Sequence, residues 1–292
     1  MTRGFLVVDK PRGISSNAVV GRVKAATGIK KVGHAGTLDP LATGAMVVAV
    51  GQVTRLIRFI QDQPKEYLAT AEFGVATDTL DADGAVLSRE PMDFSKESLM
   101  AAAERFVGNI HQVPPMVSAL KHEGRRLYEL AREGTVIERE ARPVVIYELE
   151  IGSVGVPPYP EVEFRVVCGK GTYIRSLADD MAAVLGGAAH LTALRRTRIG
   201  SLSLDRYGLS VDDLDTWEKN ILTPAEALAD LPAVAVGEAI SNGVANGIRF
   251  VGGPLLSAPE GVPFRVIDES GSLLAVYQRV GDQAQPEVVL AQ

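Results

Sequence analysis

The chain is organised around one glycine-rich loop, Gly33-His34-Ala35-Gly36-Thr37-Leu38-Asp39-Pro40-Leu41-Ala42-Thr43-Gly44, which is followed at once by the apolar residues 45–50. Glycine permits positive φ and close backbone approach, while proline holds the residue before it in an extended conformation. Asp39 therefore lies where the direction of the chain is fixed, which suits a carboxylate that must be aimed. The Asp-Pro step is also typical of a short helix with Asp39 as N-cap and Pro40 as its first residue. Taken alone, the loop favours the helix cap.

Length and composition indicate a globular chain. The 292 residues, 46% of them apolar, suffice for one large or two ordinary domains with a proper core. The first residues lead straight into a strand-like segment, and no apolar run approaches the ~20 residues of a membrane span, so we expect a cytoplasmic protein. The lone Cys168 has no partner for a disulfide and no Cys or His at ligand spacing. It is therefore predicted to be a core residue, and no metal site is expected.

The charge is unevenly distributed along the chain. The net charge is −6, yet residues 205–292 contain five Lys/Arg and thirteen Asp/Glu, whereas the part before them is close to neutral. Phosphate binding depends on local clusters of Lys and Arg rather than on the overall charge. The composition therefore permits a nucleic-acid partner without predicting one.

Residue spacing predicts helices and strands through most of the chain. Apolar runs or period-two alternation predict strands over residues 5–8, 45–50, 67–75, 143–150 and 161–167, and helical spacing predicts helices over residues 16–27, 54–61, 95–107 and 173–185. Ser15 or Ser16 is predicted to cap the first of these helices, and Gly28 is predicted to end it. From about residue 229, short β-like runs are separated by Gly, Pro and Asp. We therefore expect two domains, residues 1–228 and a small β-rich domain of residues 229–292.

Two basic clusters could bind phosphates. Lys121, Arg125, Arg126 and Arg132 form the densest one, and the segment 195–198 forms the second. Such clusters are usually solvated helix faces, but a basic hairpin that grips phosphates has the same composition.

Single residues also allow two interpretations each. Tyr67 begins the inward face of a predicted strand, where a tyrosine belongs to the core more often than to a catalytic site. Thr172 is predicted to cap the next long helix, and Arg175 lies off the apolar face of that helix, with Asp179 as its simplest partner one turn later. The glycines near Lys170 lack the spacing of a nucleotide-binding loop.

Seven segments in a fixed order carry a family resemblance. They are Lys10-Pro11-Arg12-Gly13-Ile14-Ser15-Ser16, the loop of residues 33–44, Lys65-Glu66-Tyr67, Asp78-Thr79-Leu80-Asp81-Ala82-Asp83-Gly84, Gln112-Val113-Pro114-Pro115-Met116-Val117-Ser118-Ala119-Leu120-Lys121, Lys170-Gly171-Thr172-Tyr173-Ile174-Arg175 and Leu194-Arg195-Arg196. Together they resemble the TruB-type tRNA pseudouridine-55 synthases of the bacterial, stand-alone kind. The resemblance covers about residues 5–200 and outweighs the helix-cap interpretation.

The resemblance implies an enzyme that isomerises uridine 55 in the T-arm loop of tRNA. It assigns Asp39 as the nucleophilic carboxylate and Arg175 as its salt-bridge partner. The reaction detaches uracil from C1′, rotates it and rejoins it through C5, so it needs neither cofactor nor metal. A carboxylate can attack either C6 of the ring or C1′ of the ribose, and an adjacent guanidinium favours its ionised form. The sequence does not choose between the two carbons.

The resemblance also assigns residues that bind the extruded base. Tyr67 would stack against the target uracil, Tyr173 and Leu194 would form walls of its pocket, and His34 would fill the space that the base leaves. Extrusion costs a few kcal/mol of unstacking, which such contacts offset. The RNA backbone would be held by Lys121, Arg125, Arg126, Arg195 and Arg196.

The implied fold is an α+β (α/β) pseudouridine synthase fold, with a mixed, largely antiparallel sheet and flanking helices. A small C-terminal β-rich domain of PUA type follows it. The C-terminal block here is short and acidic, which departs from a basic RNA-binding module.

The implied partner is tRNA alone, bound by a monomer. Two alternatives stay open, a non-catalytic RNA-binding protein, which would not need Asp39, and a guide-RNA-dependent synthase. The segments 78–84 and 121–132 favour the stand-alone type.

Overall fold

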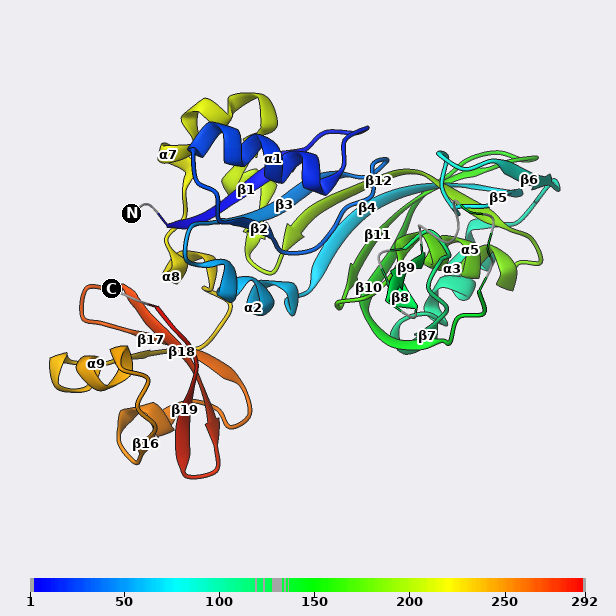
Figure 1. Ribbon diagram of the computed structural model, residues 1–292. Coiled ribbons are helices and arrows are strands. Elements are labelled where there is room, and N and C mark those ends of the chain that lie inside the picture. The colour runs from blue at the N-terminus through cyan, green and yellow to red at the C-terminus, as the bar shows by residue number, and fades with distance from the viewer. Residues whose placement is uncertain are drawn as a thin grey trace.

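The computed structural model describes residues 3–118, 120–122, 124–127, 133, 135 and 137–290 (Figure 1). Its main sheet has ten strands in the order β14-β1-β3-β12-β4-β11-β10-β7, with β2 paired to β3 and β13 to β12. The β1–β14 and β3–β12 pairs are parallel and the others antiparallel, which confirms the mixed, largely antiparallel sheet. The strands are β1 (Gly4–Lys10), β2 (Val32–His34), β3 (Thr43–Val50), β4 (Lys65–Phe73), β7 (Gly108–Gln112), β10 (Arg142–Val154), β11 (Glu161–Cys168), β12 (Ala189–Ile199), β13 (Leu202–Ser203) and β14 (Gly208–Ser210).

Helices cover both halves of this sheet. Figure 1 shows α1 over the part formed by β1 and β3, and α3 and α5 beside the part formed by β10 to β12, while β4 and β12 run across the molecule between the two. The helices of this part are α1 (Ser16–Thr27), η1 (Thr54–Leu56), α2 (Ile57–Gln61), α3 (Lys96–Glu104), α5 (Ile174–Val184), α6 (Leu204–Tyr207), η2 (Val211–Thr216), α7 (Trp217–Asn220) and α8 (Pro224–Ala227). Within the part of the chain that the structure describes, no helix is long and apolar enough to cross a membrane.

The helix ends show where local sequence signals were sufficient. Ser15 accepts a hydrogen bond from the Ala18 N–H and begins α1, and Gly28 ends α1 in the left-handed conformation, as its sequence predicts. The predicted cap of α5 is wrong, because Tyr173 occupies that position without a side-chain cap bond. Thr172 instead donates its hydroxyl to the Gly169 carbonyl, 3.2 Å away, which closes the preceding turn.

Strand β4 has two different faces. Tyr67, Ala69, Ala71 and Phe73 are buried and share an apolar cluster with residues of α5, as the period of two predicts. The residues of the opposite face are partly or fully exposed, and Leu68 among them is 48% exposed. The predicted core position of Cys168 is confirmed, and burial raises the pKa of its thiol to about 11.

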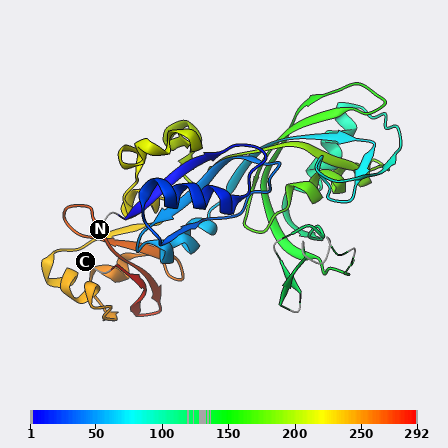
Figure 2. The same cartoon turned by 45° about the horizontal axis from the view of Figure 1, so that its top comes forward.

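Two short hairpins extend from the main sheet. The first joins β5 (Val75–Thr77) and β6 (Val86–Arg89) through the segment 78–85. The second joins β8 (Lys121–His122) and β9 (Arg125–Arg126) in the basic segment, and Figure 2 shows that this hairpin projects from the main sheet. Arg132 of this basic segment lies outside the described residues.

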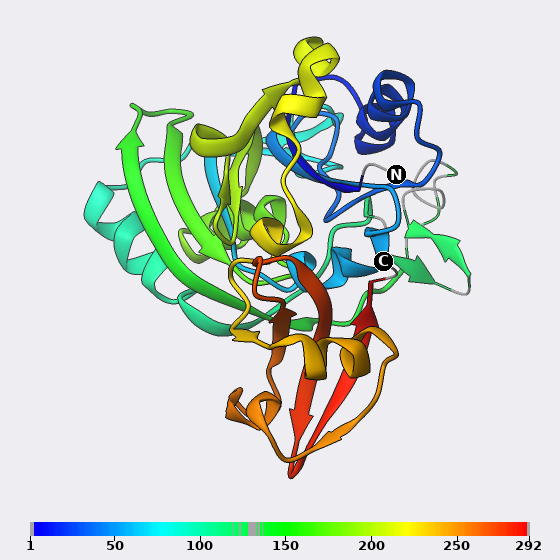
Figure 3. The same ribbon diagram turned by 90° about the vertical axis from the view of Figure 1, so that its left-hand side faces the viewer.

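The C-terminal part forms a separate five-stranded sheet in the order β15-β17-β18-β19-β16. Its elements are β15 (Ala233–Ala235), α9 (Glu238–Ala245), β16 (Phe250–Val251), η3 (Pro254–Ser257), β17 (Pro263–Ile267), β18 (Leu273–Val280) and β19 (Gln283–Val289). Figure 3 shows this sheet beneath the main body. Val276 and Val288 of the small sheet share one apolar cluster with Leu56, Ile60 and Leu228 of the main body. The β-rich character is confirmed, while the domain boundary at residue 228 and the PUA type stay predictions.

Candidate active site

Contacts with neighbouring segments fix the loop between β2 and β3. Ser16 Oγ accepts a hydrogen bond from the Leu38 N–H at 2.8 Å and donates one to the Leu38 carbonyl at 2.9 Å. The Gly13 N–H donates to the Pro40 carbonyl at 2.8 Å. The loop contains no helix, so the interpretation of Asp39 as a helix cap is wrong. Ser16, the first residue of α1, therefore fixes the backbone next to Asp39.

Lys10 lies beneath this loop. Its ammonium is buried and donates to the carbonyls of Pro11, Ile14 and Pro40 at 2.9, 2.8 and 3.3 Å. Burial lowers the pKa of Lys10 to about 8, and the negative charge of Asp39 has a smaller, opposite effect on that pKa. The loop that carries Asp39 is thus held by a cation from the end of β1.

Asp39 and Arg175 form an ion pair. Arg175 Nη2 lies 2.8 Å from Asp39 Oδ2, and the arginine side chain is 4% exposed whereas that of Asp39 is 42% exposed. The guanidinium also donates to the carbonyls of Thr79 and Val117, each at 2.7 Å, and its Nη1 lies 3.4 Å from Asp81 Oδ2. A buried, fixed cation therefore orients a carboxylate that remains accessible.

Asp81 is a member of the site that the sequence analysis did not single out. Its carboxylate is buried, accepts from the Thr79 hydroxyl at 2.5 Å, and lies beside Nη1 of Arg175, whereas Asp39 lies beside Nη2. Asp179 does not take this place, because it accepts a hydrogen bond from the Ala189 N–H, so the surface pair of Arg175 with Asp179 is wrong. Only the family motif of residues 78–84 pointed to Asp81.

A cavity of about 680 Å³ opens beside the ion pair. Asp39, Tyr67, Tyr173, Arg175 and Leu194 all line it, although they come from the loop, β4, the start of α5 and β12. Its volume lies in the range of pockets that hold small molecules or single nucleotides. The structure thus brings together the predicted nucleophile and four of the five predicted substrate-binding residues.

The two tyrosines of the cavity have different neighbours, Arg196 beside Tyr67 and Gln112 beside Tyr173. Burial raises the pKa of Tyr67, while the charge and a hydrogen bond of Arg196 act in the opposite direction. Burial also raises the pKa of Tyr173. Gln112 fixes the backbone of Tyr173, accepting from its N–H at 2.8 Å and donating to its carbonyl at 3.0 Å. Gln112 is a second residue that the sequence analysis left without a role.

His34 lies on β2 and is not among the residues that line the cavity. Burial lowers the pKa of its imidazole, and its Nδ1 has no hydrogen-bond partner among the described residues. Its role in filling the space of the extruded base stays a prediction.

The basic residues predicted to hold RNA are not equivalent. Arg196 is 1% exposed and donates to the Ala45 carbonyl at 2.7 Å and the Gly36 carbonyl at 3.1 Å, and its role as a phosphate contact stays a prediction. These two bonds link β12 to Gly36 within the central loop and to Ala45 just after it. Arg195 points elsewhere and pairs with both carboxylate oxygens of Asp9, at 3.1 and 2.7 Å.

The basic hairpin is described only in part. Lys121 and Arg126 lie on its two strands, but their side chains lie outside the described residues. Arg125 forms an ion pair with Glu133. The role of all three in binding RNA stays a prediction.

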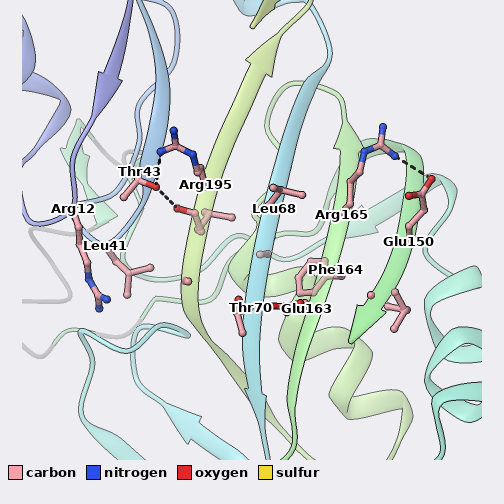
Figure 4. Close-up of a pocket in the computed structure, with 15 residues that line it drawn as sticks. Arg12, Leu41, Thr43, Leu68, Thr70, Glu150, Glu163, Phe164, Arg165 and Arg195 are labelled. Carbon is pink, nitrogen blue, oxygen red and sulfur yellow. Dashed lines mark hydrogen bonds and ion pairs between the residues drawn. The ribbon is translucent and has the colours of Figure 1, made fainter. Parts of the chain in front are cut away.

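A second cavity of about 620 Å³ lies along β12, β4, β11 and β10 (Figure 4). Arg12, Leu68, Phe164 and Arg195 are among its lining residues, and Leu194 is the residue that it shares with the first cavity. Asp39 does not line it, so this second cavity is separate from the ion pair.

Gly44 provides a test of the packing under the loop. Its φ is +105°, and a Cβ there would lie 2.2 Å from the Arg196 carbonyl oxygen. We expect Gly44→Ala to lower the free energy of unfolding by more than about 2 kcal/mol, because positive φ and a backbone clash both oppose the methyl group. Gly28→Ala is the matched control, since Gly28 has φ +69° but open space around it. The free energies of unfolding are measured with urea, and an equal loss in the two variants would contradict the close packing of Gly44 against Arg196.

The geometry can be compared with known proteins. A family model described as TruB family pseudouridylate synthase (N terminal domain) matches residues 24–174, more than half of the chain. The chain belongs to the TruB family of pseudouridylate synthases. This confirms the resemblance and makes the protein an isomerase.

Curated relatives of this TruB-family chain match it over nearly its whole length. The tRNA pseudouridine synthase B of Burkholderia pseudomallei (strain 668) is 41% identical over 97% of this chain and 95% of its own length. The tRNA pseudouridine synthase B of Ralstonia nicotianae is 42% identical over 97% of this chain and 93% of its own length. Among solved structures, a chain of a Cbf5-Nop10-Gar1 complex matches with a TM-score of 0.76 over 98% of this chain and 84% of that chain, at 24% identity. This last match confirms the pseudouridine synthase fold.

Proposed function

We propose that the protein converts uridine 55 in the T-arm loop of tRNA to pseudouridine, as a single chain in the cytoplasm and without a cofactor. The observation that carries the proposal is the ion pair of Asp39 with the buried Arg175 at a cavity of nucleotide size. The relatives named tRNA pseudouridine synthase B support tRNA as the substrate class.

In this proposal the uridine leaves its RNA stack and enters the cavity. Tyr67 stacks on the uracil, Tyr173 and Leu194 enclose it, and His34 takes its place in the RNA. Asp39 attacks C6 or C1′, the glycosidic C1′–N1 bond breaks, and the uracil turns within the closed site. C5 then bonds to C1′, the bond between Asp39 and the substrate breaks, and C5 loses its proton while N1 takes one up from water, so that no atom is gained or lost overall.

Arg175 contributes by holding Asp39 in position. A planar guanidinium that holds one carboxylate oxygen leaves the other free to attack the substrate. Three further contacts, to Thr79, Val117 and Asp81, fix the guanidinium before the substrate arrives. Such preorganisation avoids reorganisation during the reaction.

RNA contacts outside the cavity complete the proposal. The basic hairpin with Lys121, Arg125 and Arg126 would hold backbone phosphates, as would Arg195 after release from Asp9. A guide-RNA-dependent enzyme is the alternative, and it would require further components for activity.

The proposed function is tested by mapping the product. Purified protein is incubated alone with a tRNA transcript, and pseudouridine is located by chemical modification and primer extension. We expect one modified position, uridine 55, and no modification when cytidine replaces it. Modification at other uridines would refute the site specificity, and a requirement for added RNA would favour the guide-dependent alternative.

A further inference from the structure

Burial divides the cationic residues of the cavity beside Asp39 into two groups. Its cationic lining residues are Arg58, Lys65, Lys170, Arg175 and Arg196. Lys65, Arg175 and Arg196 are buried, and each donates to backbone carbonyls. The side chains of Arg58 and Lys170, by contrast, are 50% and 72% exposed. Among the described lining residues, these two are the cations that can reach a group outside the cavity.

Each exposed cation is held by a carboxylate. Arg58 Nη2 lies 2.5 Å from Glu287 Oε2 and 3.2 Å from the Glu287 carbonyl oxygen. Lys170 Nζ lies 2.6 Å from Asp62 Oδ1. Glu287 belongs to β19, so the C-terminal sheet supplies a negative charge directly to a cation of the cavity lining. Because the cation of each pair is at least half exposed and exposed ion pairs contribute little to stability, another anion can replace the carboxylate.

The chemistry of an extruded nucleotide makes phosphate the anion that fits. When a base enters a pocket, its ribose and the two flanking phosphates stay at the mouth. Guanidinium and ammonium groups bind phosphate through the same donors that they offer to a carboxylate. Arg58 and Lys170 come from separate segments, α2 and the turn before α5, so each is available to a different phosphate.

We propose that Arg58 and Lys170 bind the two RNA phosphates that flank the extruded uridine, and that Glu287 and Asp62 occupy these cations until the RNA replaces them. The inference rests on the proposed function, because it requires an RNA strand at the cavity. It gives the acidic C-terminal domain a definite role. Glu287 competes with the RNA for Arg58 and thereby weakens binding, which aids release of the modified product.

The test is the salt dependence of binding. Dissociation constants for a T-arm stem-loop transcript are measured over a range of salt concentrations, and modification of the same transcript is measured in parallel. We expect Arg58→Gln and Lys170→Gln each to reduce the slope of log K against log salt by about 0.7–0.9, the value of one lost phosphate contact. Glu287→Gln should bind RNA several-fold more tightly, and this gain should vanish when Arg58→Gln is also present.

A second surface pair serves as the control. Arg22 lies 3.7 Å from Asp212, does not line the cavity, and has a side chain 50% exposed, the same as Arg58. Arg22→Gln and Asp212→Asn should therefore leave the slope unchanged. If Arg58→Gln and Lys170→Gln keep the wild-type slope while the wild-type protein modifies the transcript, the phosphate contacts are refuted and the proposed function is not. An equal reduction of the slope in Arg22→Gln would refute the phosphate contacts too. Failure of the wild-type protein to modify the transcript would instead reject the proposed function, whatever the slopes.

Discussion

Replacement of Asp39 by asparagine is expected to abolish pseudouridine formation in a protein that stays folded and still binds RNA. Asparagine matches aspartate in size, and its amide oxygen can accept from Arg175 in place of Oδ2. The amide cannot act as a nucleophile, so the single-turnover rate should fall by at least about 10⁴-fold, as when a covalent nucleophile is removed. No helix begins at Asp39, so the substitution removes no cap.

The measurement compares rate, thermal unfolding and RNA affinity in one preparation. Asp212→Asn is a matched control, because Asp212 also pairs with an arginine but does not line the cavity. It should keep most of the single-turnover rate. Activity retained in Asp39→Asn would refute the nucleophile, and a large drop in melting temperature would assign Asp39 a structural role.

Arg175→Lys should produce the second largest loss of activity. The ammonium is a point charge, whereas the guanidinium contacts two carboxylates and two carbonyls at once. We expect a loss of about 10²-fold or more in rate, because Asp39 is no longer aimed. Unsatisfied carbonyls around a buried cation should also lower the free energy of unfolding, by about 2 kcal/mol.

Asp81→Asn separates these two effects. It removes a charge from the buried side of Arg175 but leaves the contact with Asp39 in place. We expect stability to fall as much as in Arg175→Lys, with a smaller loss of rate. Equal rates for Arg175→Lys and wild type would show that the ion pair with Asp39 is unnecessary for catalysis.

Local patterns in the sequence predicted those features that depend on residues close together in the chain, such as helix ends and the buried face of a strand. Ser15 and Gly28 bound α1, and the alternation along β4 gave its buried face, because both signals lie within one element. The pairing of Asp39 with Arg175 came only from the family resemblance. The two residues lie on distant segments that the sheet brings together, and no spacing rule covers such a contact.

The errors have the same physical origin. Arg195 and Arg196 were treated as one basic patch, yet successive residues of a strand point to opposite faces. Arg195 therefore meets Asp9, while Arg196 lies under the central loop. The helix cap at Asp39 failed because Ser16, from another segment, holds Leu38. The pair of Arg58 with Glu287 joins α2 to β19 near the other end of the chain, so no local pattern predicts it.

Release of tritium is the most direct test of the central claim, that this chain alone isomerises a uridine through Asp39. Formation of the C5–C1′ bond requires loss of the hydrogen on C5. A T-arm transcript labelled with tritium at C5 of uridine 55 is incubated with purified protein, without cofactor, metal or other protein. We predict that the wild-type protein releases one tritium to water for each transcript and that Asp39→Asn releases none. Absence of release by the wild-type protein, or full release by Asp39→Asn, would contradict the account.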